Sequence, residues 1–462
     1  MPAVPGSLDS LLFLFAEAFS GPSLQTFRML VVGFLSRVGE HTVCGMLQAA
    51  RLERSWHHSR AHDFFAARKW CPDRVGLVFL DFLLATFVPA EQPIRVVVDD
   101  TLFKRTGKKV YGAHWQYDGA APAGAPSQIA FGNNWVVMTL VVRFPFTARA
   151  VSLPVLLRLW RPDPQTKTAK TKNSTGKRPA HKPNPASPSK AELARRLLDL
   201  VIARYPDRKI ELLCDSAYAT KALRGLPERV SVTSRLRSNA ALYAPKPPRT
   251  GKRGQPAKKG ARLPTLKHIA ADTATIWKPT QVARGAGKRQ HTVLCHTFQA
   301  LWYEVWGQQP VAVVLVKTAT TTNGYDIALI STDINATPGQ IIERYDERWS
   351  IEVCFQDARE ITGVGEARNR VQKAVERTVP FGMLCQTLTV AWYARAGRAE
   401  HDVKHRRWHS PWYRQKRNPS YQDMLSSLRR ALIAAQYSPV TGRTPNPQIT
   451  ANPPSTLNAA AA

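Results

Sequence analysis

Two aspartates stand where predicted β-strands end. Asp100 follows the apolar run of residues 96–98, and Asp215 follows the apolar run of residues 212–214. Ligands in α/β proteins are usually held at the ends of the strands, so acids in these equivalent places could converge on one site. An aspartate at a strand end is also a common turn or helix-cap residue, and either one alone would favour that interpretation.

A third acid, Glu352, is predicted to lie on a helix. Thr337 and Gln340 have the spacing of a capping box, and Pro338 occupies the first helical position, where a missing N–H costs nothing. Spacings of three, four and seven residues place four side chains on one face of this helix: Tyr345, Arg348, Glu352 and Arg359. Arg348 and Glu352 could equally form an ordinary surface pair one turn apart.

The net charge of the chain indicates which substrate these acids could act on. The 65 Lys and Arg against 33 Asp and Glu give a formal net charge of +32, which favours nucleic acid as the partner. Carboxylates would repel a phosphodiester unless metal ions lay between them. Two Mg²⁺ ions about 4 Å apart, held by carboxylates, activate an attacking oxygen and stabilise a leaving one.

Length and composition narrow the class of protein. A chain of 462 residues is expected to form two or three domains. No apolar run approaches the roughly 20 residues that span a bilayer, so we expect no membrane partner. The six cysteines lack the spacing of a metal site or a disulfide framework, which fits a reducing cytoplasm.

The hydrophobic pattern predicts an α/β core after a helical region. Apolar residues recur at helical spacing up to about residue 90. A DNA-binding helix-turn-helix there is one possibility, and a packed helical core is the other. Three strands are predicted first, at 94–98, 135–142 and 151–159. A helix, a strand at 210–214, a short helical stretch and a strand at 230–235 then follow.

Composition divides the rest of the chain. Residues 161–190 and 245–267 are rich in Lys and Pro and are predicted to be flexible basic loops. Strands at 311–316 and 325–331 predict a β-rich insertion. The predicted organisation has five segments: a helical N-terminal region (1–90), the first part of a catalytic core (91–240), a basic loop with the β-rich insertion (241–333), returning catalytic helices (334–395), and a basic, aromatic C-terminal region with a disordered tail (396–462).

These features together resemble the DDE transposases of bacterial insertion sequences, over roughly residues 94–362. The most specific element is the spacing of Tyr345, Arg348, Glu352 and Arg359, which resembles the Tyr-Arg-Glu-Lys signature of one large transposase group, with Arg in place of the final Lys. The resemblance implies a ribonuclease H-like mixed sheet with flanking helices and a β-rich insertion before the last catalytic helix.

The resemblance also implies roles for residues. Asp100, Asp215 and Glu352 would be catalytic and would hold two Mg²⁺ or Mn²⁺ ions. Tyr345, Arg348 and Arg359 would contact DNA phosphates near the cleaved end, and Lys104, Lys108 and Trp115 could line the DNA path, although loop lysines are often only solvated. The reaction would be hydrolysis at the transposon ends followed by attack of the freed 3′ hydroxyl on target DNA. A homodimer on paired double-stranded ends, in the bacterial cytoplasm at the nucleoid, is implied by the family alone.

Asp99 is an alternative to Asp100. Consecutive residues of a strand face opposite sides, so only one of the two can point at the metals. The family's aspartate precedes Thr, which favours Asp100 over Asp99.

Two other functions stay open from the sequence. One is a ribonuclease H-like nuclease that cuts DNA without joining it, and the other is an inactive DNA-binding protein descended from a transposase.

Overall fold

A computed structural model describes residues 3–122, 124–162, 187–247, 257–285, 289–322 and 324–437. The central parts of both predicted basic loops, residues 163–186 and 248–256, lie outside the described residues, as does the predicted disordered tail from residue 438.

The centre of the fold is a mixed sheet, as predicted. Its first six strands are β1 (Ile94–Lys104), β2 (His114–Tyr117), β3 (Ile129–Val142), β4 (Val151–Trp160), β5 (Ile210–Cys214) and β6 (Val230–Arg235). β3 runs antiparallel to β1, β2 and β4, whereas β1, β5 and β6 are parallel to one another. This α/β arrangement is consistent with a ribonuclease H-like fold.

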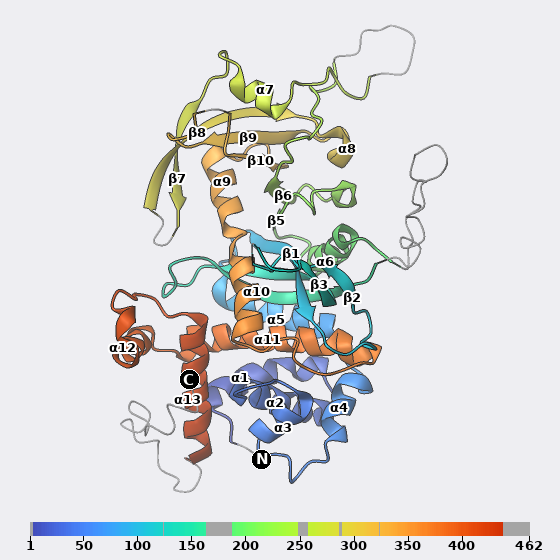
Figure 1. Cartoon of the computed structure of the whole chain (residues 1–462), viewed down its shortest axis with the longest axis vertical. Coiled ribbons are helices and arrows are strands. Elements are labelled where there is room, and N and C mark those ends of the chain that lie inside the picture. Colours follow the sequence, from blue (N-terminus) through green and yellow to red (C-terminus); the bar gives the residue numbers. More distant parts are fainter. Residues whose placement is uncertain are drawn as a thin grey trace.

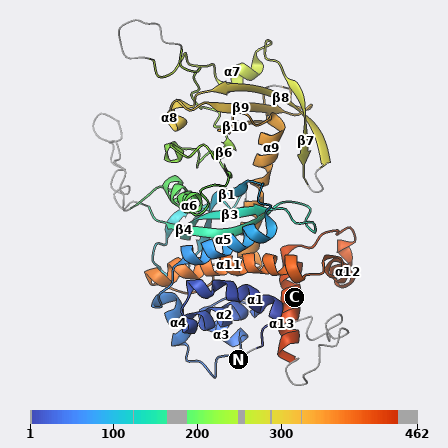
Figure 2. The ribbon, with the colours of Figure 1, turned by 180° about the vertical axis from the view of Figure 1, so that it is seen from behind.

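Helices cover the sheet. α6 (Lys190–Arg204) packs on β3 and β4, while α5 (Pro72–Phe87) and α11 (Gln372–Ala396) pack on β4. α6 begins with a capping box between Ser189 and Glu192, followed by an apolar face that includes Leu197 and Val201. Figure 2 shows α5 and α11 stacked beneath the strands, with the other N-terminal helices below them.

The N-terminal region is helical and shares its core with the sheet. Its remaining elements are α1 (Gly6–Phe13), a 3₁₀ turn η1 (Leu14–Ala18), α2 (Gly21–Ser36), α3 (Val43–Ala49) and α4 (Ser59–Ala66). Buried residues of these helices, such as Phe27 and Phe64, belong to one continuous apolar cluster with Val97 of β1 and Phe381 of α11.

The β-rich insertion extends the same sheet. It contains α7 (Leu266–Ala271), β7 (Lys278–Arg284), β8 (Arg289–Ala300), α8 (Tyr303–Trp306), β9 (Val311–Lys317) and β10 (Ile327–Ser331). The short helical stretch predicted between β5 and β6 is a 3₁₀ turn, η3 (Lys221–Leu223). Because β10 pairs with β6, the ten strands form one sheet in the order β2-β3-β1-β5-β6-β10-β9-β8-β7, with β4 beside β3 (Figure 1).

The helix predicted to carry all four signature residues is two helices. α9 (Pro338–Glu347) has the predicted capping box, and α10 (Ser350–Glu360) follows it after Arg348 and Trp349. The amides of these two residues bond three residues back, to Tyr345 and Asp346, which tightens the turn while the backbone stays in the right-handed helical region. In Figure 1 the two helices run from the insertion down to α11.

The C-terminal region comprises α12 (Ala399–His409), η4 (Pro411–Tyr413) and α13 (Tyr421–Tyr437). Arg406 and Lys416, two of its cations, form ion pairs with the buried Asp423 of α13 at 2.7 and 2.9 Å. Part of this positive charge therefore serves packing. Trp408 and Trp412 are 82% and 76% exposed.

None of the described helices combines the length and apolar character needed to cross a bilayer.

The packing of α5 on the sheet depends on a glycine. A Cβ added at Gly76 would lie 2.1 Å from the carbonyl oxygen of Val155 in β4, whereas one added at Gly6 of α1 would meet nothing within 4 Å.

We predict that Gly76→Ala lowers the free energy of unfolding by about 1 to 3 kcal/mol despite the better helix propensity of Ala, because the helix must move off the sheet. Gly6→Ala is the matched control. Chemical denaturation of both variants checks the prediction, and equal stabilities would contradict it.

Candidate active site

Asp99 and Asp100 lie on opposite faces of β1. Strand residues alternate, so Asp99 shares a face with Thr101. The guanidinium of Arg348 lies 3.4 Å from Oδ2 of Asp99, and that of Arg359 donates to Oγ1 of Thr101 at 2.7 Å. The face with Asp99 is therefore the face that α10 covers.

Arg348 connects the acids on this face. It donates to Oε1 of Glu352 at 2.7 Å in addition to its contact with Asp99. Its guanidinium carbon lies 5.5 Å from the centre of the Tyr345 ring. Asp215, at the end of β5, is close enough to Asp99 for their charges to interact. Five of the residues considered for the site from the sequence, Asp99, Asp215, Tyr345, Arg348 and Glu352, are thus brought together.

The surroundings of Asp99 disfavour its ionised form. Burial is the largest cause, and the charges of Asp100 and Asp215 add to it, raising the pKa of Asp99 to about 7. The amide of Asp100 donates to Oδ1 of Asp99 at 2.8 Å and Arg348 lies near Oδ2, and both of these contacts oppose the rise. Burial therefore outweighs the two contacts that favour the ionised carboxylate.

Asp100, the residue that the sequence favours, has a different set of partners. Its Oδ1 accepts a hydrogen bond from the hydroxyl of the buried Tyr218 at 2.9 Å, and its Oδ2 forms an ion pair of 2.6 Å with Lys190. Lys190 begins α6, and Tyr218 comes three residues after Asp215. Asp100 therefore ties β1 to α6 and to the loop that carries Asp215. No motif in the sequence marks Lys190 or Tyr218, and the alternation of side chains along β1 indicates only that Asp100 needs a partner on its own face.

A buried carboxylate outside the sequence-predicted set holds α9 in place. Glu347 is 7% exposed and accepts from Arg95 of β1 at 2.5 Å and from Arg143 at 2.6 Å. Arg95 also pairs with Glu211 of β5 at 2.6 Å, and Arg344 of α9 pairs with Glu211 at 3.0 Å. Because removing one partner of a buried ion pair leaves an uncompensated charge, this network fixes the position of α9 on the strands that carry the aspartates.

The three other residues predicted to contact DNA lie away from the acids. Lys104, at the end of β1, pairs with Asp118 at 2.9 Å, and Lys108 is exposed in the loop that follows. Trp115 is 71% exposed on β2.

The donor set suits a hard divalent cation. Asp99, Asp215 and Glu352 offer only carboxylate oxygens, which Mg²⁺ and Mn²⁺ prefer. Within the described parts of the chain, however, no three His, Cys, Asp or Glu side chains are grouped closely enough to hold a metal ion. Arg348 joins Asp99 to Glu352 in this arrangement.

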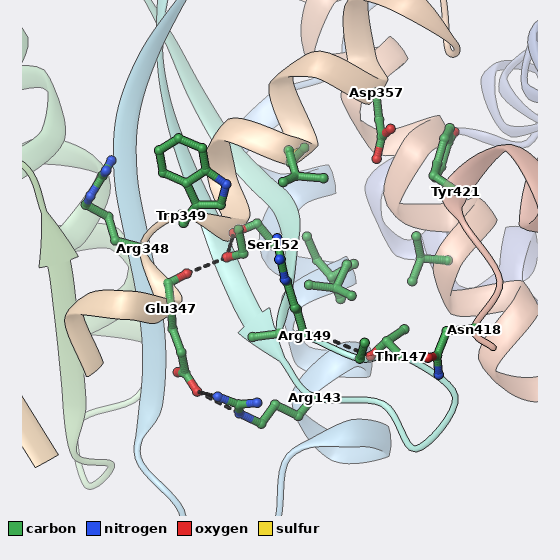
Figure 3. A pocket seen from close by; sticks show the side chains of 18 of the residues that line it. Arg143, Thr147, Arg149, Ser152, Glu347, Arg348, Trp349, Asp357, Asn418 and Tyr421 are labelled. Carbon is green, nitrogen blue, oxygen red and sulfur yellow. Dashed lines mark hydrogen bonds and ion pairs between the residues drawn. The ribbon is translucent and has the colours of Figure 1, made fainter. Parts of the chain in front are cut away.

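A cavity of about 620 Å³ lies between α10, the loop before β4 and the segment that leads into α13 (Figure 3). Figure 3 shows Arg348 on the far side of the helix from Asp357 and Tyr421, and the Glu347 carboxylate held by Arg143 at the cavity wall. Burial, with a smaller contribution from the charge of Glu360, raises the pKa of Asp357 to about 7.

The pKa of Asp357 gives stability a pH dependence. The folded state holds this proton up to a higher pH than the unfolded state, so stability falls as the pH rises from about 4 to about 7. We predict that Asp357→Asn raises the free energy of unfolding by about 2 kcal/mol at about pH 8 and much less at about pH 4. Denaturation of both proteins at the two pH values tests this, and a gain that does not depend on pH would contradict it.

Comparison with known proteins identifies the family. A family model described as DDE superfamily endonuclease matches residues 15–297, more than half of the chain. The match includes Asp99, Asp100 and Asp215 and ends before Glu352. A search of curated proteins found no match. The chain belongs to the DDE superfamily endonucleases.

Proposed function

We propose that this endonuclease is the transposase of a bacterial insertion sequence, which cleaves DNA at the element's ends and joins the freed 3′ hydroxyl to target DNA. The observation that carries the proposal is the group formed by Asp99, Asp215, Arg348 and Glu352 on one face of a sheet in a chain of net charge +32. Acids gathered on a strongly basic protein fit metal-dependent chemistry on a phosphodiester.

We assign the metal-binding role to Asp99 together with Asp215 and Glu352. Asp99 faces the helix that carries Glu352, whereas both oxygens of Asp100 are engaged by Tyr218 and Lys190. Divalent ions bound there would supply an activated oxygen nucleophile and stabilisation of the leaving oxygen. In this assignment Asp100 positions the strand and the Asp215 loop.

The cations of this face would bind and orient the substrate. Arg348 is 13% exposed and Arg359 is half-buried, so both guanidinium groups are held by their surroundings before DNA arrives. A planar guanidinium can grip a phosphate through two parallel hydrogen bonds. Tyr345 lies beside Arg348 and would complete the phosphate contact. Lys104 and Lys108 would contact phosphates further along the DNA.

Membership of the Tyr-Arg-Glu-Lys group, action as a homodimer on paired ends, and association with the bacterial nucleoid are parts of the same proposal. Strand joining separates a transposase from a nuclease that only cuts. Joining of a labelled 3′ end to a plasmid supports the transposase, whereas cutting without joining would favour the nuclease.

The acids make the first prediction from this proposal. Asp99→Asn, Asp215→Asn and Glu352→Gln each keep side-chain volume and remove a metal-binding charge, so each should abolish cleavage of a labelled end in Mg²⁺ or Mn²⁺. Asp100→Asn should lower the rate by only about 10- to 100-fold, the usual effect of an outer-shell partner. Excess chelator should stop the wild-type reaction.

The control for these variants is Asp199→Asn, which changes an exposed acid paired with Arg195 on α6 and should leave cleavage unchanged. Circular dichroism and DNA binding verify that each variant folds. Near wild-type cleavage by Asp99→Asn would remove Asp99 from the site, and loss of activity by Asp100→Asn alone would restore the assignment to Asp100.

Arg359 provides a separate prediction. Its guanidinium bonds to Thr101, and in the resembling group a Lys stands at this position. Arg359→Lys keeps the charge and should retain partial cleavage, whereas Arg359→Ala should lose much more, because Arg offers two parallel hydrogen bonds and Lys a point charge. Cleavage and joining by wild type, Lys and Ala are measured side by side. Equal rates in all three would exclude Arg359 from substrate binding.

A further inference from the structure

Four apolar side chains form an exposed strip at the edge of the sheet: Trp115 and Tyr117 of β2, and Ile129 and Phe131 of β3. Trp115, Tyr117 and Ile129 are 71%, 65% and 57% exposed. The rings of Trp115 and Phe131 lie 5.7 Å apart, centre to centre. Large apolar side chains that are this exposed at the edge of a sheet usually mark a surface that binds a partner.

The strip lies on the face of the sheet that carries the candidate site. Trp115 is paired with Phe131 and Tyr117 with Ile129, while Thr101 of β1 is paired with Trp135 further along β3. Paired residues of antiparallel strands share a face, and every second residue along a strand returns to it. The strip therefore shares its face with Asp99 and Thr101.

Arg359 lies between the strip and the acids. It donates to Thr101 and is close enough to Asp118, the residue after Tyr117, for their charges to interact. The loop between β1 and β2 also presents exposed Lys108 and Lys109. A phosphate-binding cation and an aromatic surface thus lie next to each other, which is how proteins commonly hold unpaired nucleotides.

We infer that the strip stacks on unpaired bases of the DNA strand whose phosphates Arg359 contacts. The inference rests on the proposed function and adds the form of DNA that the site accepts, namely a duplex end opened into single strand. Trp115 and Tyr117 supply the rings for stacking, and Ile129 and Phe131 extend the apolar surface against which the bases lie. A second copy of the chain is the alternative occupant of such a surface.

Binding without cleavage tests the inference. The probes are a mixed-sequence duplex with a short single-stranded 3′ extension that contains 2-aminopurine, and the same duplex with a blunt end, both in Ca²⁺ without Mg²⁺. The wild type should bind the extended duplex more tightly and quench its fluorescence. Trp115→Leu should weaken binding of the extended duplex by roughly 10-fold with little effect on the blunt one, because stacking on one base is lost.

The remaining variants separate stacking from packing. Trp115→Phe keeps a ring and should retain most of the preference, and Tyr117→Leu should reduce it. The matched control is Phe13→Leu, which changes a half-exposed ring of α1 and should leave it unchanged.

An unchanged preference in Trp115→Leu and Tyr117→Leu would overturn the inference. A change in sedimentation coefficient without a change in DNA preference would overturn it in favour of a second copy. Because nothing is cleaved in this assay, its outcome is independent of whether the acids prove essential.

Discussion

The position of Glu352 relative to the aspartates depends on the buried carboxylate of Glu347. Arg95 of β1 and Arg143 hold this carboxylate at 2.5 and 2.6 Å, and Arg344 and Arg95 meet again at Glu211 of β5. Buried ion pairs of this kind add little net stability, but they penalise any arrangement that separates the partners. The end of α9 is thereby fixed on β1 and β5, the two strands that carry Asp99, Asp100 and Asp215. Glu352 follows only five residues later, in the first turn of α10.

Because side chains alternate along β1, its two adjacent acids face opposite sides of the sheet and have different partners. The side with Asp99 meets Arg348 and, through Thr101, Arg359. The side with Asp100 meets Lys190 of α6 and Tyr218. One carboxylate is left with a raised pKa beside other acids, where a divalent cation would relieve the repulsion. The other is paired with the ammonium of Lys190. In the proposed assignment, these two adjacent aspartates therefore have different roles.

Much of the fold could be predicted from the sequence because its buried parts have strong patterns. The strands at 210–214 and 230–235 have the predicted bounds. The first is a short, mostly apolar run between Lys209 and Asp215, and the second alternates apolar and polar residues from Val230 onward. The capping box at Thr337 is also confirmed. The sequence does not predict β7 and β8, because most of their residues are polar.

The geometry of the site was harder to predict than the strands. Helical spacing could not reveal that the backbone tightens at Arg348, because its dihedral angles remain helical. The choice between Asp99 and Asp100 depends on which face of β1 α10 covers. Nothing in the sequence distinguishes Glu347 from the other acids of its helix or indicates that Arg95 and Arg143 bind it. Both depend on tertiary contacts among β1, α6, α9 and α10.

The most direct test of the assignment is to locate the metal. Crystals of the protein with a cleaved DNA end and Mn²⁺ would give an anomalous signal at each ion. We predict an ion within about 2.0 to 2.5 Å of carboxylate oxygens of Asp99, Asp215 and Glu352, with Asp100 still bound to Lys190 and Tyr218. An ion coordinated by Asp100 in place of Asp99, or by none of these acids, would contradict it.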